Sequence, residues 1–375
     1  MRGSWPQLSC AGARAEASPD RGSMTAPPAA GPRVGSDAVE FVVDEPRLRG
    51  VALLHELRRP RRVEFERASG AWRLSFRRPD ADRMEYLLEL THRNGRSSVV
   101  RDETNPRRAP GPFGDKSVIE FPDYELPAWV VDEDAAEGSL RELPLASDRL
   151  REVVPAVLWS AADTDPAQPL PLLVVHDGPE YGAYSALVRL LDHLVDFGEV
   201  PELRAALLPP PGDRNESYSA SARYANALAA DLVPGIVRAA PTDRRVVFAG
   251  ASLGALAALH GHFRNPGLVA GLFLQSGSFF RRRYDTYEFG FPRFARIARF
   301  VGEVHGRTGF APQVPVTLTC GTAEENLANN RALAGALERR GWDVRTLWNR
   351  DAHNWTAWRD ALHPNLAELL LRAWT

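Results

Sequence analysis

The chain has 375 residues, enough for two domains with separate cores. Its 44% hydrophobic and 25% charged residues are typical of globular proteins, and a formal net charge of -2 provides no strong field for nucleic acid or an anionic membrane. The two cysteines, Cys10 and Cys320, predict neither a disulfide framework nor a metal site, and no apolar run reaches the length of a membrane span. We therefore expect no nucleic-acid, membrane or metal partner.

Residues 1–37 are rich in Pro, Gly, Ala and Ser, a composition that predicts a disordered tail. This segment lacks the continuous apolar core of a secretory signal, so we expect the protein to be cytoplasmic. Met24 is an alternative start of the chain.

From residue 38 to residue 129 the pattern is that of β-strands. Apolar and polar residues alternate, as in half-buried strands, at 62–68 and 71–77, and we expect further strands at 84–92, 97–101 and 117–121. Asn94-Gly95 predicts a hairpin turn between two of these strands. Strands this short and closely spaced predict a small β-sandwich domain over residues 38–129.

The stretch 130–138 contains an acidic run of small residues and predicts a linker. Beyond it, strands and helices alternate over residues 139–375, which predicts an α/β domain whose doubly wound, mainly parallel sheet is covered on both faces. We expect strands at 154–159, 170–176, 203–208, 268–275, 314–320 and 344–348. We expect helices at 184–197, 224–237, 326–340 and 355–373.

The most informative motif is Gly250-Ala251-Ser252-Leu253-Gly254. A short apolar run precedes it and an Ala/Leu-rich helix former follows, which is the strand, turn, helix order of a nucleophile elbow. Its small residues keep side chains away from a strained turn that exposes the hydroxyl of Ser252. We predict that Ser252 is a nucleophile at a helix N-terminus, where free amides stabilise an oxyanion.

In an α/β-hydrolase the acid and the histidine follow the serine, on the loops after the last two strands. His353, between the last predicted strand and the closing helix, is therefore the predicted base. Glu324 and Glu325 both follow the preceding strand. We choose Glu324 as the acid and keep Glu325 as the alternative, which would otherwise cap the next helix. Asp351 is too close in sequence to His353 to orient it easily.

An oxyanion hole needs two backbone donors. The amide of Leu253 is predicted to be the first. The second should come from the loop after the strand 170–176, where Pro179 has no amide hydrogen. Gly178 or Glu180 must then supply it, and we choose Gly178.

Two arginines are candidates for substrate contact. Arg282 belongs to an insert rich in arginine and aromatic residues at 279–308, which could form a lid for an anionic, aromatic substrate. The alternative for this insert is a solvated helix with its arginines outward and its aromatic residues packed inward. Arg214, in the long loop after the strand 203–208, is either the second candidate or an ordinary surface arginine.

Taken together, these motifs make the chain resemble the enterochelin esterase-like members of the esterase D group of α/β-hydrolases. The resemblance rests on the strand ending in Asp177-Gly178, the loop Asp213-Arg-Asn-Glu-Ser-Tyr, the elbow, Leu274-Gln-Ser-Gly-Ser-Phe, Cys320-Gly-Thr-Ala-Glu-Glu-Asn with Asn330-Arg331, and His353-Asn-Trp-x-x-Trp-Arg. Asn105-Pro and Lys116-Ser-Val-Ile-Glu-Phe-Pro are similar to the family's immunoglobulin-like N-terminal domain, so the resemblance covers about residues 40–375. The sequence departs in two places: Arg214 and Glu216 are one residue closer together than in the family's loop, and Ala255 stands where a third glycine is common.

The resemblance implies ester hydrolysis, in the name-giving members of ferric siderophore trilactones, by a Ser-His-acid triad without a cofactor. We therefore expect a serine carboxylic ester hydrolase that forms an acyl-enzyme and whose partner is a small-molecule ester. Two alternatives stay open. One is an acyltransferase, in which an alcohol replaces water, and the other is a non-catalytic binding module with a vestigial triad. The sequence leaves the oligomeric state open.

Overall fold

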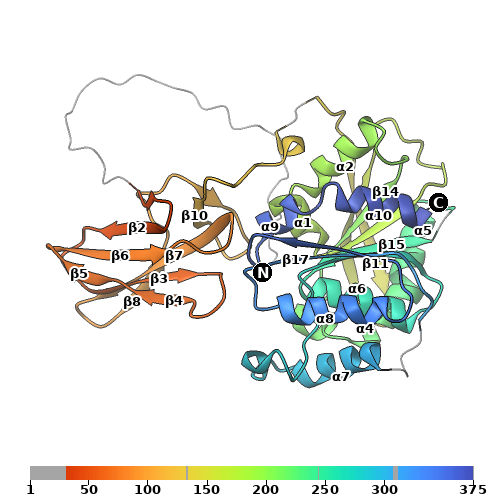
Figure 1. Ribbon diagram of the computed structural model, residues 1–375. Coiled ribbons are helices and arrows are strands. Elements are labelled where there is room, and N and C mark those ends of the chain that lie inside the picture. Colours follow the sequence, from red (N-terminus) through yellow and green to blue (C-terminus); the bar gives the residue numbers. More distant parts are fainter. Residues whose placement is uncertain (1–30, 132–133, 244, 307–310, 375) are drawn as a thin grey trace.

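The computed structural model describes residues 31–131, 134–243, 245–306 and 311–374. Figure 1 shows two parts that lie side by side: a β block (residues 33–120) of two antiparallel sheets, and an α/β part (residues 139–374) built on one large sheet. The predicted disordered tail is described only from residue 31, so Cys10, Met24 and most of that prediction lie outside the described residues.

Both sheets of the β block are antiparallel, with the orders β1-β2-β6-β5 and β4-β3-β7-β10-β9, and β8 also pairs with β7. The strands are β1 (Arg33–Val34), β2 (Ala38–Val43), β3 (Leu48–His55), β4 (Arg62–Glu64), β5 (Glu66–Ala68), β6 (Ala71–Arg77), β7 (Arg83–His92), β8 (Ser97–Val100), β9 (Arg108–Ala109) and β10 (Lys116–Glu120). Apolar side chains of both sheets, such as Phe41, Trp72 and Tyr86, share one core. The stretch 62–68, expected as one strand, passes from one sheet to the other at the buried Phe65.

The α/β part is built on an eight-stranded sheet with the order β11-β12-β14-β13-β15-β16-β17-β18. Its strands are β11 (Ser139–Ser147), β12 (Glu152–Ser160), β13 (Leu172–His176), β14 (Arg204–Leu208), β15 (Val246–Ala251), β16 (Val269–Gln275), β17 (Val316–Gly321) and β18 (Val344–Asn349). The strands from β14 to β18 are parallel, whereas β11 and β12 are antiparallel at one edge. The sheet is therefore mixed and mainly parallel.

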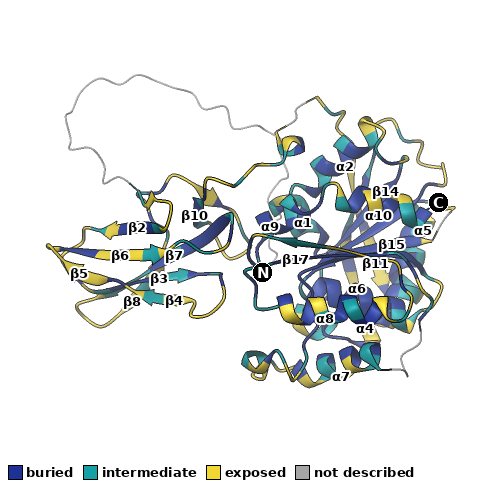
Figure 2. Cartoon of the chain, in the orientation of Figure 1, coloured by how far each residue is buried: buried dark blue, intermediate teal, exposed yellow. Residues whose placement is uncertain are grey.

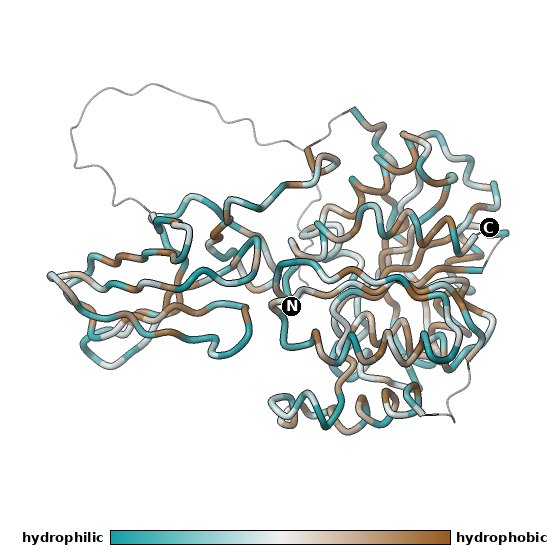
Figure 3. Tube along the Cα trace, viewed as in Figure 1, coloured by the Kyte–Doolittle hydropathy of each residue, from teal (hydrophilic) through white to brown (hydrophobic). Residues whose placement is uncertain are grey.

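Helices cover both faces of this sheet. They are α1 (Gly178–Tyr184), α2 (Leu187–Asp196), α3 (Arg214–Tyr218), α4 (Ala222–Ala227), α5 (Val233–Ala239), α6 (Leu253–Arg264), α7 (Phe294–His305), α8 (Leu327–Glu338), α9 (Trp355–Asp360) and α10 (Asn365–Trp374). One apolar core lies beneath α4, α5, α6, α7 and α8, and a second lies beneath α1, α2, α9 and α10. The central strands are accordingly buried (Figure 2) and apolar (Figure 3), as a doubly wound sheet requires.

Three expected helices differ from those observed. The closing helix predicted over 355–373 is divided into α9 and α10, because Pro364 lacks the amide hydrogen that a continuous helix needs. The helix predicted over 184–197 is preceded by a separate α1, which has Pro179 in its first turn. The helix predicted over 224–237 is α4 followed by a π-helical segment and α5. None of these differences moves the loops that carry the predicted site.

The junction between the two parts differs slightly from the expected boundaries. Arg33–Val34 form β1 and pair with β2, although they lie within the predicted tail. Trp129, at the end of the predicted sandwich, is 3% exposed and belongs to the core beneath α2. In the described part of the chain, no helix is both long and apolar enough to cross a membrane.

Candidate active site

Ser252 stands at the turn between β15 and α6, as predicted. Its backbone has φ 55° and ψ -122°, a strained conformation for a residue with a side chain. The end of β16 holds this turn, because the Ser252 amide donates to the carbonyl of Gln275 at 2.9 Å and the Ser252 carbonyl accepts from the amide of Ser278 at 3.1 Å. The expected need for small neighbours is confirmed, since a Cβ at Gly250 would come within 2.6 Å of the backbone of Gly254.

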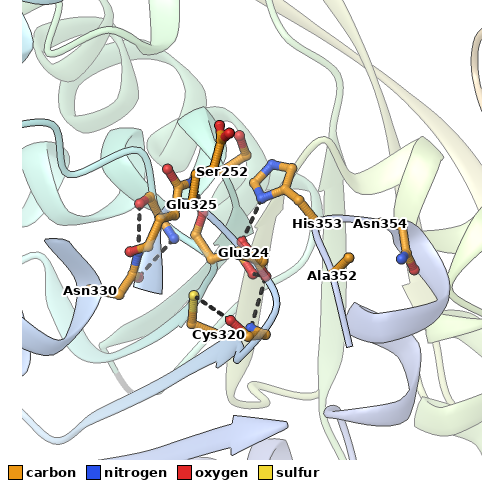
Figure 4. A network of polar contacts seen from close by, with 12 residues as sticks. Ser252, Cys320, Glu324, Glu325, Asn330, Ala352, His353 and Asn354 are labelled. Carbon is orange, nitrogen blue, oxygen red and sulfur yellow. Dashed lines mark hydrogen bonds and ion pairs between the residues drawn. The ribbon is translucent and has the colours of Figure 1, made fainter. Parts of the chain in front are cut away.

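His353 follows β18, and its Nδ1 lies 2.8 Å from Oε2 of Glu324, which follows β17 (Figure 4). Glu324 is 2% exposed. Its Oε1 accepts hydrogen bonds from the hydroxyl of Ser276 at 2.5 Å and from the amide of Gly321 at 2.8 Å. Trp358 in turn donates its indole N–H to the Ser276 oxygen at 2.9 Å. A buried chain of hydrogen bonds therefore holds the carboxylate that orients the histidine.

Ser252 and His353 line the same pocket, which has a volume of about 230 Å³. Its walls are formed by Arg61, Ser252, Leu253, Ser278, Phe280, Glu288, Phe291, Glu324, Glu325, Asn326 and His353. In Figure 4 the ring of His353 lies between Ser252 and Glu324. The Ser252 hydroxyl is 3.3 Å from that of Ser278.

The two competing acidic residues, Glu325 and Asp351, are engaged elsewhere. Glu325 binds Arg59 and Arg61, each at 2.9 Å, and makes no cap on α8, so the capping role suggested for it is wrong. Asp351 is buried and pairs with Arg83 at 3.4 Å. Burial raises the pKa of Asp351 to about 7, although Arg83 opposes this shift. Of the two adjacent glutamates, only Glu324 is hydrogen-bonded to His353 among the described contacts.

Three supporting residues are not among the predicted site residues: Ser276, Trp358 and Asn330. Asn330 is fully buried and exchanges two hydrogen bonds with the backbone of Gly277, at 3.0 and 2.9 Å. Ser276 has φ 46°, so the turn after β16 is strained and needs this support. The only sequence signal for the three is that each lies in a block on which the family resemblance rests.

The two predicted oxyanion donors lie in different surroundings. Leu253 lines the pocket, and as the first residue of α6 its amide has no partner within the helix. Gly178 begins α1 and packs against β14, where a Cβ would come within 2.3 Å of the Leu207 Cα. Gly178 is not among the described residues that line the pocket.

Arg214 binds Asp177 rather than the pocket. Its Nε and Nη2 donate to the two carboxylate oxygens of Asp177 at 2.8 and 2.7 Å. Asp177 is 2% exposed and has φ 53°, so this fork holds the turn between β13 and α1. The Arg214 guanidinium also lies over the ring of Tyr218, 5.6 Å from its centroid.

Arg282 is exposed and lies outside the set of described residues that line the pocket. The second half of the insert forms α7, whose Phe294, Ile297 and Phe300 are buried in the core, so the alternative of a helix with inward aromatic residues is correct for this helix. The first half nevertheless reaches the pocket through Phe280, Glu288 and Phe291.

Carboxylates outnumber arginines among the described residues that line the pocket. Among its described lining residues, Arg61 is the only arginine, and it lies with the carboxylates of Glu288 and Glu325. Burial raises the pKa of Glu288, Glu325 raises it further, and Arg61 lowers it. Arg59 provides a second cation at Glu325. No group of three or more His, Cys, Asp or Glu side chains in the described part of the chain is placed to hold a metal ion.

Comparison with known proteins gives one family match. Residues 159–369, more than half of the chain, match the family described as “Putative esterase”. No curated protein matches the sequence at a significant level.

Solved structures of similar fold include esterases. The enterobactin esterase FES from Shigella flexneri, determined in the presence of enterobactin, has a TM-score of 0.73 at 19% identity, with 91% of this chain and 96% of that chain covered. The ferric enterobactin esterase (fes) from Salmonella typhimurium has a TM-score of 0.73 at 20% identity, with 89% and 93% covered. A feruloyl esterase module from Clostridium thermocellum, complexed with sinapinate, has a TM-score of 0.51 at 14% identity, with 67% and 95% covered. The chain therefore has the fold of α/β esterases.

Proposed function

This chain belongs to the esterase family that matches residues 159–369 and is an ester hydrolase, and we propose that Ser252, His353 and Glu324 are the triad that performs the hydrolysis. The family match confirms the resemblance found in the sequence and argues against a non-catalytic binding module. The observation that carries the proposal is the 2.8 Å contact between His353 Nδ1 and a buried Glu324, at the pocket that also holds the elbow serine.

In this mechanism the ionised Glu324 accepts the Nδ1 hydrogen of His353, so Nε2 is free to act as the base. His353 takes the hydroxyl proton of Ser252 as the serine oxygen attacks the ester carbonyl. The tetrahedral oxyanion is stabilised by the amide of Leu253 and by a second donor, for which Gly178 is the proposed residue. The alcohol leaves with the proton from His353, and water activated by the same histidine then releases the acid from the acyl-enzyme.

For the substrate, we place a ferric siderophore trilactone of the enterobactin type first. The support is the similarity of fold to enterobactin esterases, which extends over 91% of this chain and includes the β block. Phe280 and Phe291 in the pocket suit an aromatic acyl group. Arg282 and Arg214 stay proposals as substrate contacts, and the argument for the substrate does not use them.

A second candidate is a neutral aromatic ester. The arginines beside the pocket are matched by Glu288 and Glu325, so an anionic ferric catecholate would gain little net attraction from this wall. A neutral ester of a phenolic acid would use the same aromatic side chains without that disadvantage. The carboxylates beside these arginines therefore favour a neutral ester over an anionic ferric catecholate.

The test is hydrolysis of three compounds by the wild type and by Ser252→Ala: a ferric tricatecholate trilactone, its metal-free form, and the methyl ester of a hydroxycinnamic acid. Faster cleavage of the ferric trilactone than of the others, lost in Ser252→Ala, would support the first candidate. Faster cleavage of the methyl ester would support the second. Cleavage that persists in Ser252→Ala would refute the triad. Added alcohol that accumulates as a new ester would favour the acyltransferase alternative.

We also propose the domain organisation that the sequence predicts. Residues 38–129 would form an immunoglobulin-like sandwich, with β1 added at its start, residues 130–138 the linker, and residues 139–375 the catalytic domain. Two antiparallel sheets around one core support the sandwich. A cytoplasmic location stays a prediction from the sequence.

A further inference from the structure

The loops that carry Glu324 and His353 both reach the β block, which lies beside the α/β part near α9 (Figure 1). The residue before each of them is an alanine. Ala352 is 1% exposed and belongs to the apolar core of the β block, and Ala323 packs against that core. The core of the β block therefore extends to both catalytic loops.

Arg58, in the connection between β3 and β4, binds the acid loop through its backbone. Its Nη2 donates to the carbonyl of Thr322 at 2.8 Å, and its Nε donates to the carbonyl of Glu324 at 3.3 Å. Two neighbouring arginines in the same connection bind the side chain of Glu325. One short segment of the β block thus holds both the backbone and a side chain of the acid loop.

Arg83, at the start of β7, binds the histidine loop. It pairs with Asp351 at 3.4 Å, and both side chains are buried. The amide of Asp82 donates to the carbonyl of Arg350 at 2.6 Å in the same loop. Removing Arg83 would leave the buried Asp351 without its cation, so its carboxyl would have to take up a proton or the loop would have to move.

The two catalytic loops are also bonded to each other. The amides of Thr322 and Ala323 donate to the carbonyls of Asn349 and Asp351 at 2.7 and 3.1 Å. The elbow of Ser252, in contrast, is held by the end of β16 within the α/β part. A shift of the β block would therefore move the backbones of the acid and histidine loops together, while Ser276 after β16 still holds the Glu324 carboxylate in line with the elbow.

Close packing does not extend over the whole contact between the β block and the α/β part. A cavity of about 550 Å³ lies between the two parts, lined among others by Leu57, Arg58 and Phe76 of the β block and by Thr322, Ala323 and Leu327 of the α/β part. Arg58 lines this cavity and still reaches two carbonyls on its far side. On this side, the hydrogen bonds of Arg58 add to the packing of Ala323 in setting the position of the acid loop.

We propose that the β block is a positioning element of the active site, in which Arg58 sets the loop of Glu324 and Arg83 sets the loop of His353. The proposal rests on the proposed triad. It assigns to the β block an effect on the rate of the chemical step, in addition to any contact with substrate. Displacements of about 1 Å in such groups are enough to lower a rate about 10²-fold.

The test compares full-length Arg58→Ala and Arg58→Lys with Arg62→Ala. Arg62 is the matched control because it is a partly exposed arginine at the start of β4, directly after this segment. It binds Glu64 and Glu89, both within the β block. The readouts are kcat and KM on a p-nitrophenyl ester, thermal unfolding, and the downfield proton NMR signal of the His353–Glu324 hydrogen bond, assigned by its loss in His353→Asn.

We expect Arg58→Ala to lower kcat about ten- to a hundredfold with little change in KM, and to shift the downfield signal. Arg58→Lys should recover part of kcat, and Arg62→Ala should match the wild type. Equal kcat and an equal signal in Arg58→Ala and Arg62→Ala would overturn the proposal. If the wild type hydrolyses no ester, the proposed function fails, and the NMR signal of the His353–Glu324 hydrogen bond tests the positioning proposal by itself. A shift of that signal confined to the Arg58 variants would support the proposal, and the absence of a shift would overturn it.

Discussion

Replacing Glu324 by glutamine tests the triad through the geometry of one carboxylate. The Ser276 hydroxyl accepts the indole N–H of Trp358, so its own hydrogen must be donated to Oε1 of Glu324, and the amide of Gly321 can only donate to the same oxygen. In Glu324→Gln the carbonyl oxygen must take this position. The NH₂ group is then forced to face Nδ1 of His353 and to donate to it.

His353 would therefore carry its hydrogen on Nε2, the nitrogen that must accept the proton of Ser252. This is the wrong tautomer for a general base, and an acid-to-amide change of this kind lowers kcat by about 10⁴ in a serine triad. At about 1.36 kcal/mol for each factor of ten, the loss corresponds to about 5 kcal/mol of transition-state stabilisation. Stability should change little, because the glutamine fills the same space.

The assay is kcat on a p-nitrophenyl ester, with thermal unfolding measured in parallel. The adjacent Glu325→Gln is the comparison, since it removes a carboxylate that binds Arg59 and Arg61 instead of His353. We expect a loss of about 10³ to 10⁴ for Glu324→Gln and a much smaller loss for Glu325→Gln. The reasoning would be refuted if Glu324→Gln kept more than a tenth of the wild-type kcat, or if Glu325→Gln were the more damaging change.

Three further predictions concern the surroundings of the site. Ser276→Ala leaves the Trp358 indole without its acceptor and Glu324 with one donor fewer. The free energy of unfolding in urea should therefore fall by about 2 kcal/mol, and kcat should also fall. An unchanged stability would contradict the hydrogen-bond chain. Arg83→Met takes the cation from the buried Asp351 and Glu85, so the free energy of unfolding should fall by about 3 kcal/mol. Glu85 keeps Lys116, so partial recovery in Arg83→Met/Asp351→Leu would identify the charge of Asp351 as a cause. Burial lowers the pKa of His176 to about 4 and that of His260 to about 3, both below the unfolded value of about 6.5. The stability that the two neutral forms contribute is therefore complete above about pH 6.5 and is lost as the pH falls toward 4. In urea titrations, His260→Phe should weaken this loss of stability, and a pH profile equal to that of the wild type would count against the prediction.

Local chemistry made the turn at Ser252 predictable. A serine between glycines, after an apolar run and before a helix former, has few other uses, and the structure shows why: the turn has φ 55°, and there is no space for a Cβ at Gly250. The chain order of strands then limits where an acid and a base can follow. That order indicates His353 as the base and leaves Glu324 and Glu325 as candidates for the acid, of which Glu324 is three residues past Gly321. The structure brings His353 and Glu324 to the same pocket as Ser252.

Contacts between distant segments could not be read from the same patterns. Arg58 lies in a connection and Arg83 begins a strand, and in the sequence both look like ordinary charged residues. Their partners in the α/β part lie more than 260 residues away. Gly178 raised a different problem. Glycine is required at position 178 because the backbone packs closely on Leu207. A sequence motif shows that glycine stands there, but it does not distinguish this steric requirement from a role in the oxyanion hole.

Some predicted helix and strand boundaries differ from the observed ones at positions where the sequence contains a recognisable signal, such as a proline. Pro364 divides the closing helix, and Pro179 opens α1. The strand β11 is missing from the predicted elements, although Leu143 and Leu145 alternate with exposed residues in it. Its first half is exposed throughout, and an edge strand of this kind shows only part of the apolar alternation.

The most direct test of the central claim is peptide mass spectrometry after brief exposure of the folded protein to a fluorophosphonate. The account predicts one rapid adduct on the peptide that contains Ser252, greatly slowed in His353→Asn and absent in Ser252→Ala, with ester hydrolysis lost in parallel. Ester hydrolysis that continues in a protein fully modified at Ser252, or an adduct on another residue that abolishes it, would contradict the account.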